Sequence, residues 1–210
     1  MNFKQQYVHA FLIALLTFVT VEAFGQRAQF ASQMWHEGKI VLVDGDTLRG
    51  LVKYDFSQNL VQYVVNNKQA EVYTARKVLF VEIFDETVRR YRRFFVLPYE
   101  NESNYKIPMF FELLEEGRMT LLSRDMLEYK TYNSYYAYGG ISKLVEISYY
   151  YFMKDDGSIE VFRGGKNDLM AMMGNHRRNV EKYAKTNRLD FDDKFDVARI
   201  VAYYNSLTGS

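Results

Sequence analysis

Residues 39–55 read KIVLVDGDTLRGLVKYD and contain the clearest β-hairpin pattern of the chain. The apolar run Ile40–Val43 meets the turn Asp44-Gly45-Asp46. Asp-Gly between two β-rich runs is a strong hairpin signal, because Gly tolerates the positive φ of a tight turn. The chain then returns with strict alternation, which predicts a strand with one buried and one wet face. The buried face of that strand is expected to carry Leu48, Gly50, Val52 and Tyr54.

The same succession of β-rich runs and short polar turns recurs as far as residue 163. About ten strands, joined mainly by hairpins, predict a mainly antiparallel β meander over residues 26–163, sandwich or barrel-like in arrangement. The strands expected after the first hairpin are 60–65, 71–74, 78–84, 88–97, 107–114, 118–123, 145–153 and 158–162.

Residues 164–210 follow a different, helical pattern. Short helices are expected at 169–173 and 179–185, and a longer one at 195–207. In the longer helix apolar residues recur at i, i+3, i+4 and i+7, which is typical of one apolar face on an amphipathic helix. That face comprises Val197, Ile200, Val201 and Tyr204. The sequence therefore predicts an α+β protein whose C-terminal helical segment packs on the sheet.

Residues 1–25 have the pattern of a signal peptide. Lys4 precedes the apolar run 11–21, and Ala23-Phe24-Gly25 offers small residues at the cleavage positions, so the mature chain is expected to begin at Gln26. An uncleaved membrane anchor is the alternative. It is less favoured because the run falls short of the ~20 apolar residues of a spanning helix and Glu22 interrupts its end.

Composition narrows the function classes. Lys and Arg number 27 against 26 Asp and Glu, and a bulk charge of +1 recruits neither nucleic acid nor an acidic membrane. With no cysteine, the chain has no disulfide, thiolate metal site, cysteine nucleophile or lipid-attachment cysteine. Charged residues on the predicted polar strand faces, such as Arg49, Lys53 and Glu82, argue against a transmembrane barrel. The unusual feature is the aromatic content of 17%, with 18 Tyr and 16 Phe.

No motif of a catalytic, cofactor or metal site is present, and we expect no catalytic residue, no cofactor and no metal. His36 and His176 are expected to be exposed polar residues beside turns. The acidic stretch Asp190–Asp196 lacks the Gly of a calcium loop, so helix capping is favoured over calcium binding. A carboxylate-dependent hydrolase acting on envelope or extracellular glycans needs only two acidic side chains and remains the alternative function.

The densest charge cluster is Arg89-Arg90-Tyr91-Arg92-Arg93. Because side chains alternate along a strand, Arg90 and Arg92 share one face and are the candidates for an anion site that binds lipopolysaccharide or an acidic glycan. The alternative is a solvated strand whose arginines pair across the ladder with acidic residues of the preceding strand and turn. Those acidic residues are Glu82, Asp85 and Glu86.

The stretch 128–140, EYKTYNSYYAYGG, does not follow strand periodicity and is predicted to be a loop. Tyrosines among Asn, Ser, Thr and Gly give large amphipathic contact area at low entropic cost, which is typical of binding loops. The alternative is a loop whose tyrosines only cover the sheet. The candidate ligand-binding residues are Tyr129, Tyr132, Tyr135, Tyr136 and Tyr138.

Three segments, YTARKVLFVEIFDETVRRYRRFF (73–95), FFELLEEGRMTLLSR (110–124) and LDFDDKFDVARIVAYYNSL (189–207), resemble a family of uncharacterised exported proteins of Bacteroidota. The resemblance implies export and the envelope of a two-membrane cell: periplasm, outer-membrane-associated or extracellular. It implies no mechanism. The absence of catalytic motifs and the tyrosine-rich stretch lead us to expect a non-catalytic binding or envelope-associated module, whose partner is an unknown envelope protein or glycan.

Overall fold

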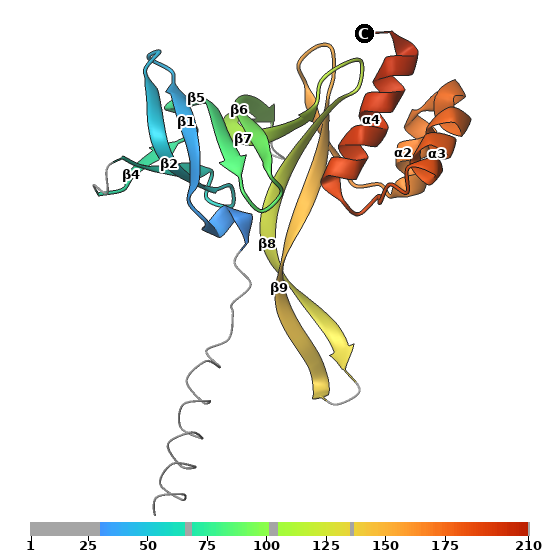
Figure 1. Cartoon of the computed structure of the whole chain (residues 1–210), viewed down its shortest axis with the longest axis horizontal. Helices are drawn as coiled ribbons and strands as arrows, with labels where there is room; N and C mark the ends of the chain where they lie inside the picture. Colours follow the sequence, from blue (N-terminus) through green and yellow to red (C-terminus); the bar gives the residue numbers. More distant parts are fainter. Residues whose placement is uncertain (1–29, 66–68, 101–104, 135–136, 210) are drawn as a thin grey trace, which may run out of the picture. The chain divides into compact units, whose positions relative to one another are not determined.

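The computed structural model describes residues 30–65, 69–100, 105–134 and 137–209, with side chains omitted at 134 and 137–139. Ten strands form one open antiparallel sheet in the order β10-β9-β8-β7-β6-β5-β1-β2-β3-β4 (Figure 1). The predicted α+β class is confirmed. The strands are β1 (His36–Leu42), β2 (Thr47–Asp55), β3 (Leu60–Val64), β4 (Glu71–Thr74), β5 (Val78–Asp85), β6 (Arg90–Glu100), β7 (Lys106–Glu115), β8 (Thr120–Ser134), β9 (Ala137–Met153) and β10 (Ile159–Phe162).

The first hairpin forms as its sequence predicts. Gly45 adopts φ 96° in the turn, where the Asp46 amide donates to the Asp44 carboxylate at 3.1 Å. Alternation then places the side chains of Val52 and Tyr54 in the core, and both are fully buried. Arg49 and Lys53 lie on the opposite face of the strand.

The N-terminal half of the sheet curls on itself. Three strands separate β4 from β5 in the sheet order, which in a flat sheet means about 19 Å. The chain crosses from Thr74 to Val78 with only residues 75–77 between, a reach of at most about 14 Å. The sheet must therefore bend, and the Val43 amide donates to the Lys77 carbonyl at 3.1 Å beside this crossing.

A pair of glycines sits inside this curl. Gly38 and Gly50 are register partners in β1 and β2. A Cβ on Gly38 would lie 2.3 Å from the Glu82 carbonyl oxygen, and one on Gly50 would lie 2.5 Å from that of Val64. Both positions require glycine because a neighbouring backbone occupies the space of the side chain.

The curl encloses the first hydrophobic core. It is rich in aromatic residues, and the Phe56 ring lies 4.6 Å from Tyr54 and 4.8 Å from Phe94, measured between ring centroids. Such contacts add to the burial of apolar area. The core comprises Ile40, Leu42, Val52, Tyr54, Phe56, Val61, Tyr63, Ala75, Val78, Val81, Ile83, Phe94 and Phe110.

Three α-helices form a second core against the other half of the sheet (Figure 1). They are α2 (Lys166–Met172), α3 (Arg177–Thr186) and α4 (Lys194–Thr208); short 3-10 turns η1 (Ala31–Gln33) and η2 (Gly174–His176) complete the elements. The predicted apolar face of α4 is confirmed, since Val197, Ile200, Val201 and Tyr204 are all buried. They pack with Leu121 of β8 and with buried residues of α2 and α3.

Strands β8 and β9 extend beyond the rest of the sheet as a two-stranded ribbon (Figure 1). β7 pairs with β8 only as far as Ser123, and β10 pairs with β9 only from Tyr150 onwards. The pairing between β8 and β9 continues to Tyr132 and Ile141, and then to the 134–137 pair. We call residues 129–133 and 140–144 the distal ribbon.

Candidate functional site

A buried cluster of charged side chains lies where the two halves of the sheet meet. At its centre Arg92 of β6 is 3% exposed and uses all five N–H donors. Nε and Nη2 form a bidentate pair with Glu112, each at 2.7 Å. Nη1 donates to Asp85 at 3.0 Å and to the Tyr54 hydroxyl at 2.6 Å, and Nη2 donates to Asp125 at 2.6 Å.

Lys194, the first residue of α4, adds a second cation from the helical layer. Its Nζ lies 2.9 Å from Glu112 and 2.5 Å from Asp125. Ser148 of β9 donates to the other oxygen of Asp125 at 2.7 Å. Burial alone would raise the pKa of Asp125, but the positive charges of Lys194 and Arg92 outweigh it and lower the pKa to about 2. The carboxylate is therefore ionised in the folded protein.

Burial and neighbouring positive charges also have opposite effects on the pKa of Glu112. Burial acts to raise its pKa, and the charges of Arg92 and Lys194 lower it below its ordinary value. Burial raises the pKa of Tyr54 well above 10.0, so its hydroxyl stays protonated while it accepts from Arg92. Buried charges are tolerated when they are paired and hydrogen-bonded in this way. We interpret this cluster as structural, because its partners occupy the polar atoms that a substrate would need.

Sequence reasoning missed this cluster. Its contacts join α4 and strands β2, β5, β6, β7, β8 and β9, so contacting partners lie as far apart as 82 residues in the chain. One signal was present: Glu112 interrupts the apolar run of residues 110–114, where a buried strand would carry no charge. A lone acidic residue in such a run predicts a buried cation, without identifying which one.

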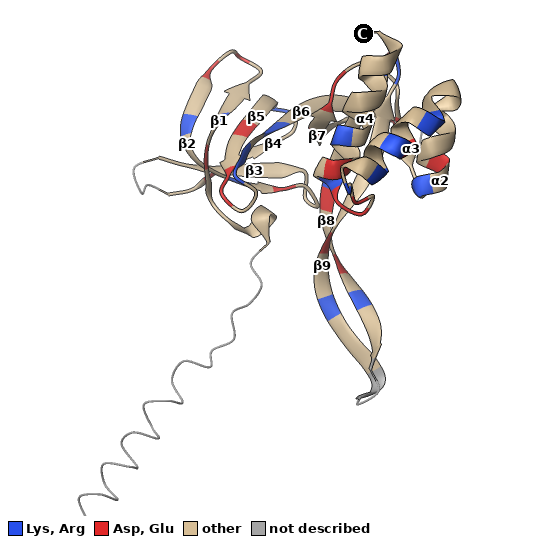
Figure 2. Ribbon diagram, turned by 45° about the vertical axis from the view of Figure 1, so that its right-hand side comes forward, with Lys and Arg blue, Asp and Glu red and all other residues tan. Residues whose placement is uncertain are grey.

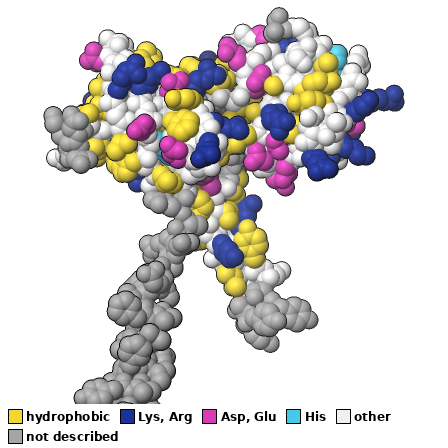
Figure 3. Space-filling model, in the orientation of Figure 1, with side chains coloured by type: hydrophobic (Ala, Val, Ile, Leu, Met, Phe, Trp, Pro, Cys, Tyr) yellow, Lys and Arg dark blue, Asp and Glu magenta, His cyan; other side chains and the backbone are white. Residues whose placement is uncertain are grey.

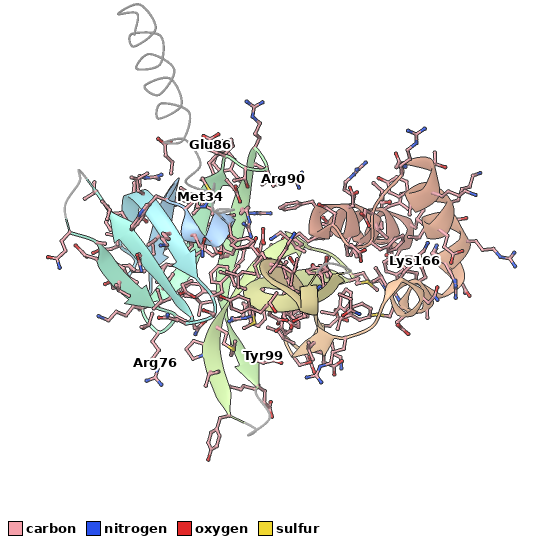
Figure 4. All side chains as sticks on the ribbon, turned by 90° about the horizontal axis from the view of Figure 1, so that it is seen from below. Met34, Arg76, Glu86, Arg90, Tyr99 and Lys166 are labelled. Atoms are coloured by element: carbon pink, nitrogen blue, oxygen red, sulfur yellow. The ribbon has the colours of Figure 1, made fainter. Side chains whose placement is uncertain are left out.

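The two arginines predicted to form an anion site have different surroundings. Arg92 faces the core and has no N–H donor left for an external anion. Arg90 is exposed and reaches towards α4, with its guanidinium 3.9 Å from the centre of the Phe195 ring (Figure 4). The structure therefore does not bring Arg90 and Arg92 together as one solvent-facing patch. The alternative prediction was a solvated strand paired across the ladder. Arg92 does pair with Asp85 at 3.0 Å, but both side chains are buried, so the strand is not solvated at this point.

The histidine prediction is wrong for His36. Its side chain is 2% exposed, and Nε2 lies 2.8 Å from the Ala31 carbonyl oxygen in η1. His176 is half-buried, with its ring edge-on to Tyr204. The capping role is confirmed for Asp193, whose carboxylate accepts from the amides of Phe195 and Asp196 at 2.8 and 3.0 Å.

Residues 30–209, apart from the gaps given above, hold no group of three or more His, Cys, Asp or Glu side chains arranged for a metal ion. No helix in that part of the chain is long and apolar enough to cross a membrane.

A hollow of about 790 Å³ opens on the outer face of β1, β2 and β5, away from the first core. Its lining includes the ion pair of Lys39 and Glu82, 2.8 Å apart, and the side chain of Glu37. The rings of Phe84 and Tyr91 meet edge-on at 5.1 Å along one side. Acidic, basic and aromatic groups thus share one open depression.

The tyrosine-rich stretch is not a loop, which corrects the prediction for residues 128–140. β8 runs to Ser134 and β9 begins at Ala137, so the segment is strand wherever it is described. Periodicity failed as a guide because both faces of an isolated ribbon meet water, and neither selects apolar residues at alternate positions. Tyr135 and Tyr136 lie outside the described residues, and Tyr138 belongs to β9 without a described side chain.

Two of the predicted tyrosines are exposed on the distal ribbon. Tyr129 is 76% and Tyr132 is 48% exposed, and Ile141 opposite Tyr132 is 46% exposed. Tyr129 and Tyr132 lie on opposite faces of β8, because their positions differ by an odd number of residues. Figure 3 shows hydrophobic and basic side chains together on this extension. Tyr129 and Tyr132 therefore do not cover the sheet, which was the alternative interpretation of this stretch.

No family model, curated protein or solved structure matches the chain. The resemblance to exported proteins of Bacteroidota stays a prediction.

Proposed function

We propose that this chain is an exported, non-catalytic binding module of the cell envelope and that the distal ribbon is its contact surface. The observation that carries the proposal is the exposure of Tyr129, Tyr132 and Ile141 on strands that extend past the last partner of the sheet. A β-ribbon this long orders many residues without adding to either core. Such an extension is costly in conformational entropy, which favours a role outside folding.

The chemistry of the ribbon supports contact with a partner. Tyrosine supplies a large, rigid and amphipathic surface and is enriched among residues that dominate binding energy. The side chains of Thr131 and Ser142 hydrogen-bond across the ribbon at 2.9 Å and help to hold its strands in register. A pre-ordered pair of strands presents its tyrosines at lower entropic cost than a loop of the same composition.

The test is a shortened variant. Glu128 and Val145 are register partners, so residues 129–144 are replaced by Asn-Gly, the preferred two-residue hairpin turn. We expect an unchanged melting temperature and a loss of sedimentation with isolated envelopes of two-membrane bacteria. Full sedimentation of the folded, shortened variant would contradict the proposal.

Point variants locate the contact within the ribbon. Tyr129→Ala and Tyr132→Ala are compared with Tyr105→Ala, a control in which the side chain is 73% exposed outside the ribbon. Loss of a tyrosine at a binding hot spot commonly costs about 2 kcal/mol or more of affinity. We expect at least one of the two ribbon variants to bind envelopes more weakly than the wild type. The control should bind like the wild type.

The hydrolase alternative has one observation in its favour, the acidic lining of the hollow on the outer sheet face. Glu37, Glu82 and Glu86 line it, and two carboxylates suffice for glycoside hydrolysis. Release of reducing sugar from envelope glycans by the purified chain, abolished in Glu37→Gln with Glu86→Gln, would favour this function over the binding module.

A further inference from the structure

One face of the distal ribbon places two lysines directly opposite each other. Lys130 and Lys143 are register partners in β8 and β9, and the following pair on that face is Tyr132 and Ile141. All four side chains are exposed. Figure 2 shows a basic residue on each strand at this level of the ribbon.

This arrangement leaves two positive charges without a counterion in the part of the chain that is described. Like charges directly opposite each other destabilise a strand pair. Neither Lys130 nor Lys143 forms an ion pair within that part. The acidic residue closest in sequence to Lys130 is Glu128, and its carboxylate accepts from the Tyr149 hydroxyl. An anion from outside the chain would relieve the repulsion between the two lysines.

We propose that this face binds the phosphate groups of an anionic phospholipid surface. The proposal rests on the proposed function, because it names the partner of the same ribbon. Lysine keeps its ammonium at the phosphate level while its stem contacts apolar material, and tyrosine concentrates at the headgroup region of membranes. The neighbouring Tyr132–Ile141 pair favours a lipid over a free phosphate, which would contact only the two ammonium groups.

The test is a vesicle titration of the exported product of the full chain. Phosphatidylcholine vesicles with and without phosphatidylglycerol are compared, and binding is measured by cosedimentation. We expect binding only where the anionic lipid is present, and each of Lys130→Gln and Lys143→Gln should weaken it about five-fold. The double variant should lose about 25-fold, and Tyr132→Ala should also bind more weakly. Lys77→Gln, at an exposed turn, is the matched control and should bind like the wild type.

Two results would overturn the lipid assignment. One is equal binding of the wild type and the double lysine variant to the anionic vesicles. The other is saturable binding of inorganic phosphate that Tyr132→Ala leaves unchanged, with no binding to vesicles, which assigns the lysine pair to a free anion. These results are distinct from a failure of the proposed function, which is shown only when the shortened variant still sediments with envelopes.

Discussion

The side-chain amide of Asn205 pairs with both backbone groups of Met119. Its Oδ1 accepts from the Met119 amide at 2.9 Å, and its Nδ2 donates to the Met119 carbonyl at 3.1 Å. The side-chain amide thus accepts one hydrogen bond from Met119 and donates one to it, as the backbone of a paired strand would, at a residue of the β7–β8 turn. Gly117 completes the fit, because a Cβ there would lie 2.6 Å from the Asn205 Nδ2. The helix α4 is thereby fixed to the sheet by a polar contact as well as by its apolar face.

Replacing Asn205 with Leu should destabilise the protein. The substitution keeps the volume but leaves both backbone groups of Met119 without their partner, at a cost of about 1–3 kcal/mol each when a buried group stays unsatisfied. Ser206→Ala is the control, since Ser206 is exposed and bonds only within its own helix. Urea unfolding of the two variants gives the comparison, and equal midpoints would mean that the amide contact is dispensable.

Removing the guanidinium of Arg92 should be far more damaging than removing that of its neighbour. In Arg92→Met the carboxylates of Asp85, Glu112 and Asp125 lose their central cation, and breaking a buried pair from one side typically costs about 3–5 kcal/mol. Arg93→Met changes an exposed side chain on the other face of β6 and should stay close to the wild type. The free energy of unfolding of both variants decides this, and a small loss in Arg92→Met would contradict the structural role.

Asp125 should make stability depend on pH in the acidic range. Its folded pKa of about 2 lies below the ordinary 3.8, so the unfolded chain binds its proton more readily. The resulting stabilisation, roughly 2 kcal/mol, is complete above about pH 5 and is lost as the pH falls towards 2. In Asp125→Asn the free energy of unfolding should be lower at pH 6 and should fall less between pH 5 and pH 2 than in the wild type.

The free energy of unfolding of Asp125→Asn should still decrease between pH 5 and pH 2, because Glu112 and Asp85 also have lowered pKa values. Asp155→Asn, in an exposed turn, serves as the control and should keep the wild-type profile. An unchanged profile in Asp125→Asn would show that folding does not lower the pKa of Asp125.

Truncating Ile200 should lower stability because the side chain is fully buried in the second core. A buried Ile cut to Ala typically costs about 2–5 kcal/mol, since a cavity remains. Arg199, the preceding residue, has a side chain that is 53% exposed and pairs with Asp196, so Arg199→Ala should change little. Thermal unfolding is the measurement, and similar melting temperatures for the two variants would mean that α4 does not dock through Ile200.

Much of the fold follows from local pattern. The hairpin around Gly45 and the apolar face of α4 were predictable because turn chemistry and periodicity act within a few residues. The placement of β1 beside β5 was not predictable, since it depends on how the sheet curls across the short 75–77 connection. Local sequence carries little information on such long-range pairing.

Part of the candidate site was likewise predictable from the sequence and part of it was not. Composition singled out Tyr129 and Tyr132 as candidate contact residues. The strands that carry them were not predicted, because their segment lacks the alternation of a half-buried strand. The Lys130–Lys143 pair depends on register, which is set by pairing further along β8 and β9. Arg92 was assigned to a surface, because nothing near it in sequence reveals that Glu112, Asp125 and Lys194 gather around it.

Lys194 is the last residue of the buried charge cluster to be synthesised, because its partners lie earlier in the chain. During synthesis the carboxylates of Asp85, Glu112 and Asp125 are complete long before Lys194 leaves the ribosome, so the cluster then has a single cation, Arg92. Burying three negative charges against one positive charge is unfavourable, which delays closure of the sheet around them until α4 arrives. We therefore expect a chain truncated before Lys194 to keep an excess of buried negative charge and to be cleaved by proteases faster than the full chain.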